Sequence, residues 1–196
     1  LIELQSELGN TIVFITHDLN EAMRIGDRIA VMKDGRIVQI GTAEQILQDP
    51  ANDYVAAFVQ DVDRSRVLTA SAVMQRPAAV IGPHEGPRVA IRRMEEHQLS
   101  AVYVVGARQE LKGYVRDEDA IAAVRRGEEA IDAILCDDLE TVGPDTPLVE
   151  LFTPASTSLL PLAVVDDDRR LRGVVPRVAL LAALGDNGSG DAGTTD

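Results

Sequence analysis

Several residue types are scarce in this 196-residue chain. It has no tryptophan and one cysteine, Cys136, so no disulfide can form within it, and a reducing compartment is indicated. No apolar run approaches the roughly 18 residues that a membrane-spanning helix needs. The chain opens at Leu1 with an amphipathic stretch and not with the basic start of a signal peptide. Because it also starts without methionine, we expect it to be a piece of a longer protein.

Basic residues are scarce too, with 19 lysines and arginines against 32 aspartates and glutamates and a net charge of −13. Neither half of the chain nor its tail carries a basic excess. Proteins that bind the phosphate backbone without regard to sequence need such an excess. From this composition we do not expect nucleic acid to be a partner.

The first segment has the pattern of an α/β domain. Apolar residues at helical spacing predict a helix over Leu1–Leu8. The β-branched, unbroken run Thr11–Thr16 predicts a strand that is buried on both faces, as in a parallel sheet. Asp18 or Asn20 could cap the helix that follows.

A hairpin is predicted next, because residues 29–32 and 36–40 are apolar and flank the Asp-Gly pair at residues 34–35. Thr42 and Gln45 then form a capping box at the start of another short helix.

His17 is the chemical centre of this segment. It follows the predicted buried strand directly, and open α/β sheets place their ligands at that end of a strand. A neutral imidazole there could hydrogen-bond a terminal phosphate oxygen and orient an attacking water. The alternative is that His17 is a loop residue or a helix cap.

The residues around His17 resemble the H-loop region of ABC-transporter ATPases, over residues 11–18, 21–22, 27–32 and 34–37. The resemblance implies that residues 1–60 are the C-terminal end of an ABC-type P-loop ATPase domain. It also implies that His17 is the switch histidine, which contacts the γ-phosphate of ATP, and that ATP and Mg²⁺ are the cofactors of the intact subunit. No metal ligand is predicted within the chain.

A polar linker is predicted over residues 61–71, and the stretch from Phe58 to Met74 resembles the connector of glycine betaine/proline-type ATPase subunits. This narrows the resemblance to osmoprotectant importers. It implies membrane permease subunits and a second copy of the subunit as partners, and a peripheral location on the cytoplasmic face of the inner membrane. The alternative of a methionine or sugar importer is disfavoured by the repeat that follows.

The parts that ATP hydrolysis needs most are not in the sequence. A phosphate-binding loop of the form GxxxxGK[ST] requires a lysine after a glycine and before Ser or Thr, and neither Lys33 nor Lys112 meets this rule. A signature motif and the Asp-Glu strand end are missing as well. The full-length parent would be a quaternary-amine-transporting ATPase, but we do not expect this chain to hydrolyse ATP alone.

The rest of the chain repeats itself at a spacing of 60 or 61 residues: Gly82-Pro83 recurs as Gly143-Pro144, and Leu111-Lys112-Gly113 as Leu171-Arg172-Gly173. Adjacent strands are predicted over 101–105 with 111–115, and over 162–165 with 171–175. This α+β repeat resembles a tandem cystathionine-β-synthase (CBS) pair, with module 1 at 72–127 and module 2 at 128–184. Residues 185–196 lack core-forming side chains and predict a disordered acidic tail.

CBS pairs often bind adenine nucleotides through a Gly-x-hydrophobic-Thr-x-x-Asp ending. The first copy keeps the aspartate as Asp119 but has Arg116 in place of threonine, and the second copy, residues 173–179, has lost both polar residues. The resemblance therefore implies at most one altered site, at Arg116 and Asp119, for an adenine nucleotide or cyclic di-AMP. Arg116 could pair with a phosphate; the alternative is a solvated arginine at a helix start.

The sequence thus indicates the end of an ATPase domain followed by a CBS pair. We interpret the chain as the C-terminal part of the energy-coupling subunit of an ABC transporter for osmoprotectants (glycine betaine, proline or choline). In this interpretation the CBS modules regulate transport, either by binding a ligand or by sensing ionic strength. The alternative is a stand-alone CBS module that binds adenine nucleotides.

Overall fold

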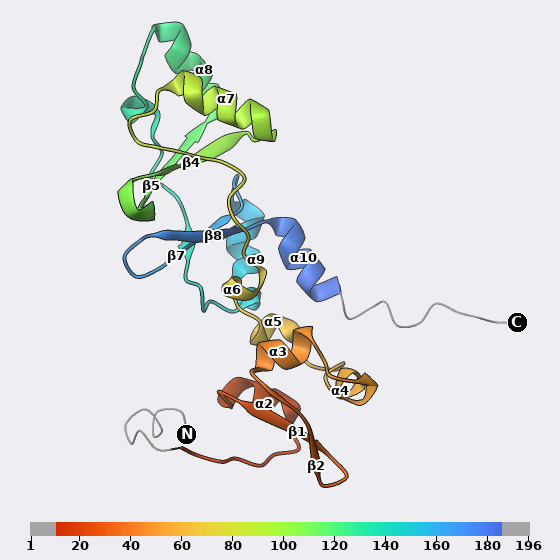
Figure 1. Cartoon of the computed structure of the whole chain (residues 1–196). Coiled ribbons are helices and arrows are strands. Elements are labelled where there is room, and N and C mark those ends of the chain that lie inside the picture. The colour runs from red at the N-terminus through yellow and green to blue at the C-terminus, as the bar shows by residue number, and fades with distance from the viewer. Residues whose placement is uncertain (1–10, 186–196) are drawn as a thin grey trace, which may run out of the picture. The chain divides into compact units, whose positions relative to one another are not determined.

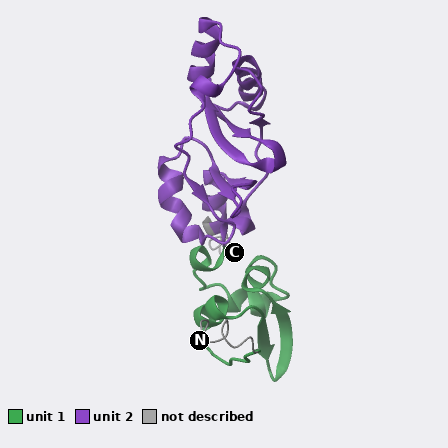
Figure 2. Cartoon of the chain, turned by 90° about the vertical axis from the view of Figure 1, so that its left-hand side faces the viewer, with its two compact units in different colours: residues 1–68, 187–196 green, residues 69–186 purple. Residues whose placement is uncertain are grey.

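The strands of the chain form three small, separate sheets. The computed structural model describes residues 11–185, and a division after Leu68 separates two compact units (Figure 2). The helix predicted over Leu1–Leu8 and nearly all of the tail predicted over residues 185–196 lie outside the described residues. Within the described range, none of the helices is long and apolar enough to cross a membrane.

The first unit places short helices around one hairpin (Figure 1). Its elements are α2 (Leu19–Ile25), β1 (Ile29–Lys33), β2 (Arg36–Gly41), α3 (Ala43–Gln48), α4 (Asp53–Phe58) and α5 (Arg64–Val67). Asp18, and not Asn20, is the cap of α2: its side chain accepts a hydrogen bond from the Glu21 amide. Thr42 and Gln45 form both hydrogen bonds of the predicted capping box at α3, which is confirmed.

The predicted hairpin is confirmed as the antiparallel pair β1–β2. Asp34 and Gly35 at its tip have φ angles of 50° and 74°, the left-handed backbone that a two-residue turn requires. One face of the hairpin is covered, since Ile29 and Val31 are buried. A β-bulge between Val31 and Met32 shifts the register, and Met32 beyond it is exposed.

The strand predicted over Thr11–Thr16 is not present in the structure. Residues 11–16 have no regular secondary structure, and the side chains of Val13 and Ile15 are 86% and 92% exposed. A strand forms only where a neighbouring strand supplies hydrogen-bond partners. None of the strands in the described part of the chain pairs with this segment. The prediction failed because the apolar run reports strand propensity but not whether a partner is present.

Hydrogen exchange should distinguish this segment from the sheets. We expect the amides of residues 11–15 to exchange nearly as fast as in an unfolded peptide, because they form no backbone hydrogen bond with any other residue of the range 11–185. The amides of residues 101–105 and 162–165, which lie in the central strands of the second unit, should be the most protected. Exchange measured by mass spectrometry on the 196-residue chain checks this; equal protection in the three segments would contradict the structure.

The stretch predicted as a polar linker, residues 61–71, contains short helices. Asp63 begins α5, where its carboxylate accepts hydrogen bonds from the Ser65 amide and hydroxyl. These bonds lower the pKa of the Asp63 carboxyl, the Ser65 hydroxyl contributing most. α6 (Ala70–Val73) begins the second unit, where the Ala70 amide donates to the Thr146 carbonyl.

Two sheets of identical topology make up the second unit (Figure 1). The first repeat consists of β3 (Val80–Ile81), α7 (Pro87–His97), β4 (Ala101–Val105), η1 (Ala107–Gln109), β5 (Leu111–Arg116) and α8 (Asp117–Arg126). The second consists of η2 (Asp132–Ile134), β6 (Thr141–Val142), α9 (Leu148–Thr157), β7 (Leu162–Val165), β8 (Leu171–Val175) and α10 (Arg177–Gly185). In each, a parallel edge strand joins an antiparallel pair, and both predicted strand pairs are confirmed.

β4 is buried along its whole length, because each of its faces meets a different partner. Val102 and Val104 pack in one apolar cluster with the helices α7 and α8. The alternate residues Ala101, Tyr103 and Val105 pack in a second cluster with residues of the other repeat, such as Ala163 and Val174. The two-residue period of a strand thus directs one face to the helices of its own repeat and the other to the facing repeat.

Main-chain hydrogen bonds also join the repeats. Gln75 and Val174 exchange both amide-to-carbonyl bonds at 2.8 Å, and Tyr114 and Cys136 exchange both at 2.9 Å. The Tyr103 hydroxyl donates to the Pro161 carbonyl, and burial raises the pKa of this phenol, so it remains a neutral donor. The two repeats are therefore held together through their backbones as well as through their apolar faces.

Candidate functional site

His17 lies at a bend between two residues that are fixed by hydrogen bonds. The Thr16 hydroxyl donates to the Glu21 carboxylate at 3.0 Å and accepts from the Asp18 amide at 3.0 Å, while Asp18 caps α2. The His17 side chain itself is exposed. The backbone on both sides of the histidine is therefore anchored to α2, and the imidazole is presented to solvent.

A magnesium site needs several oxygen ligands on one ion. Over residues 11–185, no group of three or more His, Cys, Asp or Glu side chains is arranged to hold a metal ion. The Mg²⁺ that the ATPase resemblance implies therefore has no ligand set in this part of the chain.

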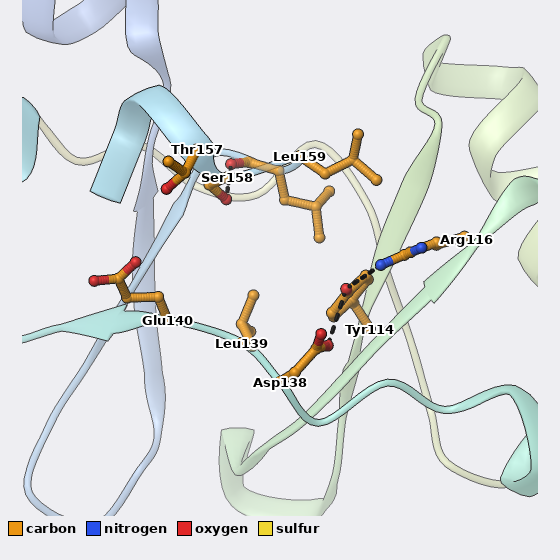
Figure 3. Close-up of a pocket in the computed structure, with 9 residues that line it drawn as sticks. Tyr114, Arg116, Asp138, Leu139, Glu140, Thr157, Ser158 and Leu159 are labelled. Carbon is orange, nitrogen blue, oxygen red and sulfur yellow. Dashed lines mark hydrogen bonds between the residues drawn. The ribbon is translucent and has the colours of Figure 1, made fainter. Parts of the chain in front are cut away.

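The second unit contains a cavity of about 240 Å³, which we call the module-interface pocket (Figure 3). β5 supplies Tyr114 and Arg116 from the first repeat. The second repeat supplies the remaining lining residues: Asp138, Leu139, Glu140, Thr157, Ser158, Leu159 and Leu160. The pocket exists only because the two repeats meet, which is typical of a ligand site between homologous modules.

Three side chains form a connected network on one side of the pocket (Figure 3). The Arg116 guanidinium donates to the Tyr114 hydroxyl at 3.0 Å, and that hydroxyl donates to the Asp138 carboxylate at 3.0 Å. The bond from Arg116 acts to lower the pKa of Tyr114, but burial and the bond to Asp138 outweigh it, and the net shift is upward. Tyr114 is therefore a neutral hydroxyl that links a cation of the first repeat to a carboxylate of the second.

Of the two residues predicted to bind a nucleotide, the structure places one in this pocket. Arg116 lines it, and its Nε atom is buried without a hydrogen-bond partner. Asp119 lies in the first turn of α8 and is not among the residues that line the pocket. The Coulomb attraction of Asp119 adds to the raised pKa of Arg116, after the larger contribution of Tyr114. The arginine and the aspartate are thus electrostatically coupled, but only the arginine faces the cavity.

Arg177 fixes the wall of the pocket opposite β5. Its guanidinium donates to the main-chain carbonyls of Ala155, Ser156 and Ser158, the last at 2.6 Å. These carbonyls lie at the C-terminal end of α9, where helical carbonyls have no intrahelical partner. Arg177 therefore ends α9 and holds the segment that contributes Ser158 and Leu159 to the pocket.

The lining residues of the second repeat were not predicted from the sequence. Asp138, Glu140 and Ser158 belong to no motif, and they lie far from Arg116 along the chain. The repeat spacing could have located them, because it shows which segments of the two copies occupy equivalent positions. Tyr114 stands within the Gly113–Asp119 motif, at a position where the pattern specifies no residue type.

Residues 70–126 match the family model of the CBS domain. Among solved structures, the chain is similar to Staphylococcus aureus OpuCA, with a TM-score of 0.52 and 23% identity over 59% of this chain and 98% of that one. It is also similar to CbpB in complex with c-di-AMP, with a TM-score of 0.55 and 15% identity over 62% of this chain and 87% of that one. These likenesses show the mixed α/β fold of a CBS pair.

Sequence similarity extends through both units. The glycine betaine/carnitine transport ATP-binding protein GbuA of Listeria monocytogenes is 46% identical over 187 residues, which are 95% of this chain and 47% of that protein. The chain thus spans about half the length of this relative. Over 95% of its length the chain is therefore a homologue of the ATP-binding proteins of glycine betaine transport, and within it residues 70–126 match the CBS domain model.

Proposed function

We propose that this chain is part of the ATP-binding, energy-coupling subunit of an ABC importer for osmoprotectants such as glycine betaine. The observation that carries the proposal is the 46% identity to a glycine betaine/carnitine transport ATP-binding protein over 95% of the chain. In this function the first unit is the end of the ATPase domain and the second regulates transport. The partners are membrane permease subunits and a second copy of the subunit, at the cytoplasmic face of the membrane.

His17 is the proposed catalytic residue of the intact subunit. Its imidazole contacts the γ-phosphate of ATP and helps to orient the attacking water. The anchoring of Thr16 and Asp18 by α2 supports this role, because it fixes the backbone from which the imidazole projects. The phosphate-binding loop and the magnesium ligands come from other parts of the subunit, so this chain alone is not an ATPase.

The second unit is proposed to bind a regulatory adenine nucleotide or cyclic di-AMP, and the module-interface pocket with Arg116 supports this mode over the sensing of ionic strength. A membrane-facing sensor needs a cationic surface. Adjacent arginines occur three times in the second unit, at residues 92–93, 125–126 and 169–170. At least one arginine of each pair is in an ion pair, and its charge is therefore partly neutralised: Arg93 with Glu96, Arg126 with Glu128, and Arg170 with Asp168.

The alternative of a stand-alone CBS module is favoured by one observation, namely that residues 69–186 form a compact unit by themselves. The two proposals differ in what the first unit does. In the transporter it completes an ATPase, whereas in a stand-alone module it has no catalytic task.

Deleting residues 69–184 from the full-length protein tests the assignment of the two units. The variant is co-reconstituted with its permease subunits in liposomes that contain ATP, and uptake of radiolabelled glycine betaine is measured with and without internal AMP or cyclic di-AMP. We expect uptake to persist and its response to nucleotide to be lost, because the deletion removes only the compact second unit.

The intact protein in the same liposomes is the control. Failure of the intact protein to drive uptake of any quaternary amine would refute the transporter proposal. A nucleotide response that survives the deletion would instead place regulation outside the CBS pair.

A further inference from the structure

The helix that follows His17 begins with a capping box that differs from the one at α3. In an ordinary capping box the side chain of the third helical residue accepts a hydrogen bond directly from the amide of the capping residue. At α3, Gln45 accepts from the Thr42 amide at 3.0 Å, and Thr42 accepts from the Gln45 amide at 3.2 Å. A box of this kind involves no residue before the cap.

At α2 a hydroxyl is inserted into the box. Asp18 is the cap, and its carboxylate accepts from the amide of Glu21, the third helical residue, at 3.1 Å. The Asp18 amide donates to the Thr16 hydroxyl at 3.0 Å, and that hydroxyl donates to the Glu21 carboxylate at 3.0 Å. The hydroxyl thus stands between the amide and the carboxylate that an ordinary box joins directly. We call Thr16, Asp18 and Glu21 the extended capping box.

The extended capping box restrains His17 from both sides. The hydroxyl proton of Thr16 is committed to Glu21, which leaves the lone pairs of the oxygen for the Asp18 amide. A hydrogen bond to a carboxylate is about twice as strong as one between neutral groups, and this one is partly buried. Glu21 belongs to α2, which is itself fixed by the buried side chain of Met23. The residues before and after His17 are therefore both tied to one helix.

This restraint matters because the His17 side chain is exposed. No surrounding side chains bury the imidazole, so its direction depends on the backbone that carries it. A misplacement of about 1 Å in a catalytic site can lower the rate about 100-fold. The alternative is that the box only stabilises α2, but a direct box would do so without Thr16.

We infer that Thr16 and Glu21 are positioning residues for His17. This inference rests on the proposed catalytic role of His17 and deepens it. Thr16 and Glu21 do not contact the phosphate; they act by fixing the backbone from which the imidazole projects. Asp18 completes the box by capping α2.

Steady-state ATPase and nucleotide-binding measurements on the full-length protein test this with variants that break the box at different points. Thr16→Val removes the hydroxyl and keeps the branched shape, and Glu21→Ala removes its acceptor. We expect each to lower kcat about tenfold with little change in nucleotide affinity, because the imidazole is still present and only its position is disturbed. Thr16→Ser and Glu21→Gln retain a donor and an acceptor and should keep at least about half of the wild-type kcat.

A double-variant cycle separates positioning of the imidazole from a general loss of stability. In the His17→Ala background, Thr16→Val should change kcat by less than about twofold, because the group that Thr16 positions is gone. Gln45→Ala is the matched control: it breaks the direct box at α3 and should leave kcat unchanged. Urea unfolding of the variants compares the stability that each box contributes.

Hydrogen exchange followed by NMR on the 196-residue chain, without nucleotide, gives a readout independent of activity. The Asp18 amide should exchange at least about threefold faster in Thr16→Val, because its acceptor is removed. The Glu21 amide donates to the Asp18 carboxylate and should exchange as in the wild type.

Unchanged exchange of the Asp18 amide would overturn the inference, and so would near wild-type kcat in both Thr16→Val and Glu21→Ala. A loss of equal size in the wild-type and His17→Ala backgrounds would show that Thr16 acts on something other than the imidazole, which also overturns it. These outcomes leave the proposed role of His17 intact. Near wild-type turnover of His17→Ala itself would instead refute that role and the inference together.

Discussion

Replacing His17 with alanine in the full-length ATP-binding protein is expected to lower ATP turnover about 100-fold while nucleotide affinity changes little. A hydrogen-bond donor that acts on charge developing in the transition state typically contributes 10²–10³ to the rate. Because the contact strengthens only as the terminal phosphate is transferred, its loss lowers kcat far more than it weakens binding. Steady-state ATPase assays combined with nucleotide-binding measurements check both parts of this prediction.

His84→Ala is the control for removing an imidazole, since His84 is exposed and lies in the second unit. It should leave turnover unchanged. Asp18→Asn tests the backbone around the histidine, because asparagine also caps helices well, and it should cost little activity. A His17→Ala variant that retains near wild-type turnover would reduce His17 to a loop residue, and the γ-phosphate role would be wrong.

The Gly113→Ala substitution is expected to destabilise the second unit by about 3 kcal/mol. Gly113 has a φ of 149°, which side chains rarely adopt, and a β-carbon there would collide with the Cys136 carbonyl oxygen. That carbonyl cannot move away cheaply, because it accepts the hydrogen bond from the Tyr114 amide that joins the two repeats. Urea unfolding followed by circular dichroism measures the loss.

The second repeat offers a matched comparison at the same position. A β-carbon on Gly173 would lie 3.0 Å from the Gln75 carbonyl oxygen, and no left-handed φ is involved, so Gly173→Ala should cost clearly less. Gly143→Ala should be nearly neutral, because the nearest atom, the Thr146 hydroxyl, is 3.6 Å away. Equal destabilisation by all three substitutions would show that the close approach at Cys136 does not determine the cost.

Local signals in the sequence predicted much of the fold. The Asp-Gly pair at residues 34–35 fixed the hairpin, and the capping box of Thr42 and Gln45 fixed the start of α3, because each depends only on neighbours in the chain. The strand pairs of the second unit followed from short apolar runs that recur at the repeat spacing. The run Thr11–Thr16 has equally strong propensity, but a strand depends on a partner that propensity does not describe.

The module-interface pocket was harder to predict, because it too depends on partners from distant parts of the chain. Arg116 was identified because it stands in a recognisable motif, whereas Asp138 reaches it only through Tyr114 and across the boundary between the repeats. Arg177 was not singled out, because the motif positions that lost their polar residues in the second copy are Pro176 and Ala179, yet Arg177 donates three hydrogen bonds to the end of α9. Side-chain partners from distant segments cannot be assigned from a single sequence without the register of the repeats.

The reciprocal hydrogen bonds between Gln75 and Val174 have a consequence for how the polypeptide is made. A ribosome synthesises Gln75 long before Val174. The backbone amide and carbonyl of Gln75 therefore stay unpaired until β8 has been made. Contacts between such distant residues slow folding, because a long loop must close before they contribute. The first repeat therefore emerges with an unpaired edge, and a nascent chain stalled before residue 174 would expose it to chaperones or to another nascent copy.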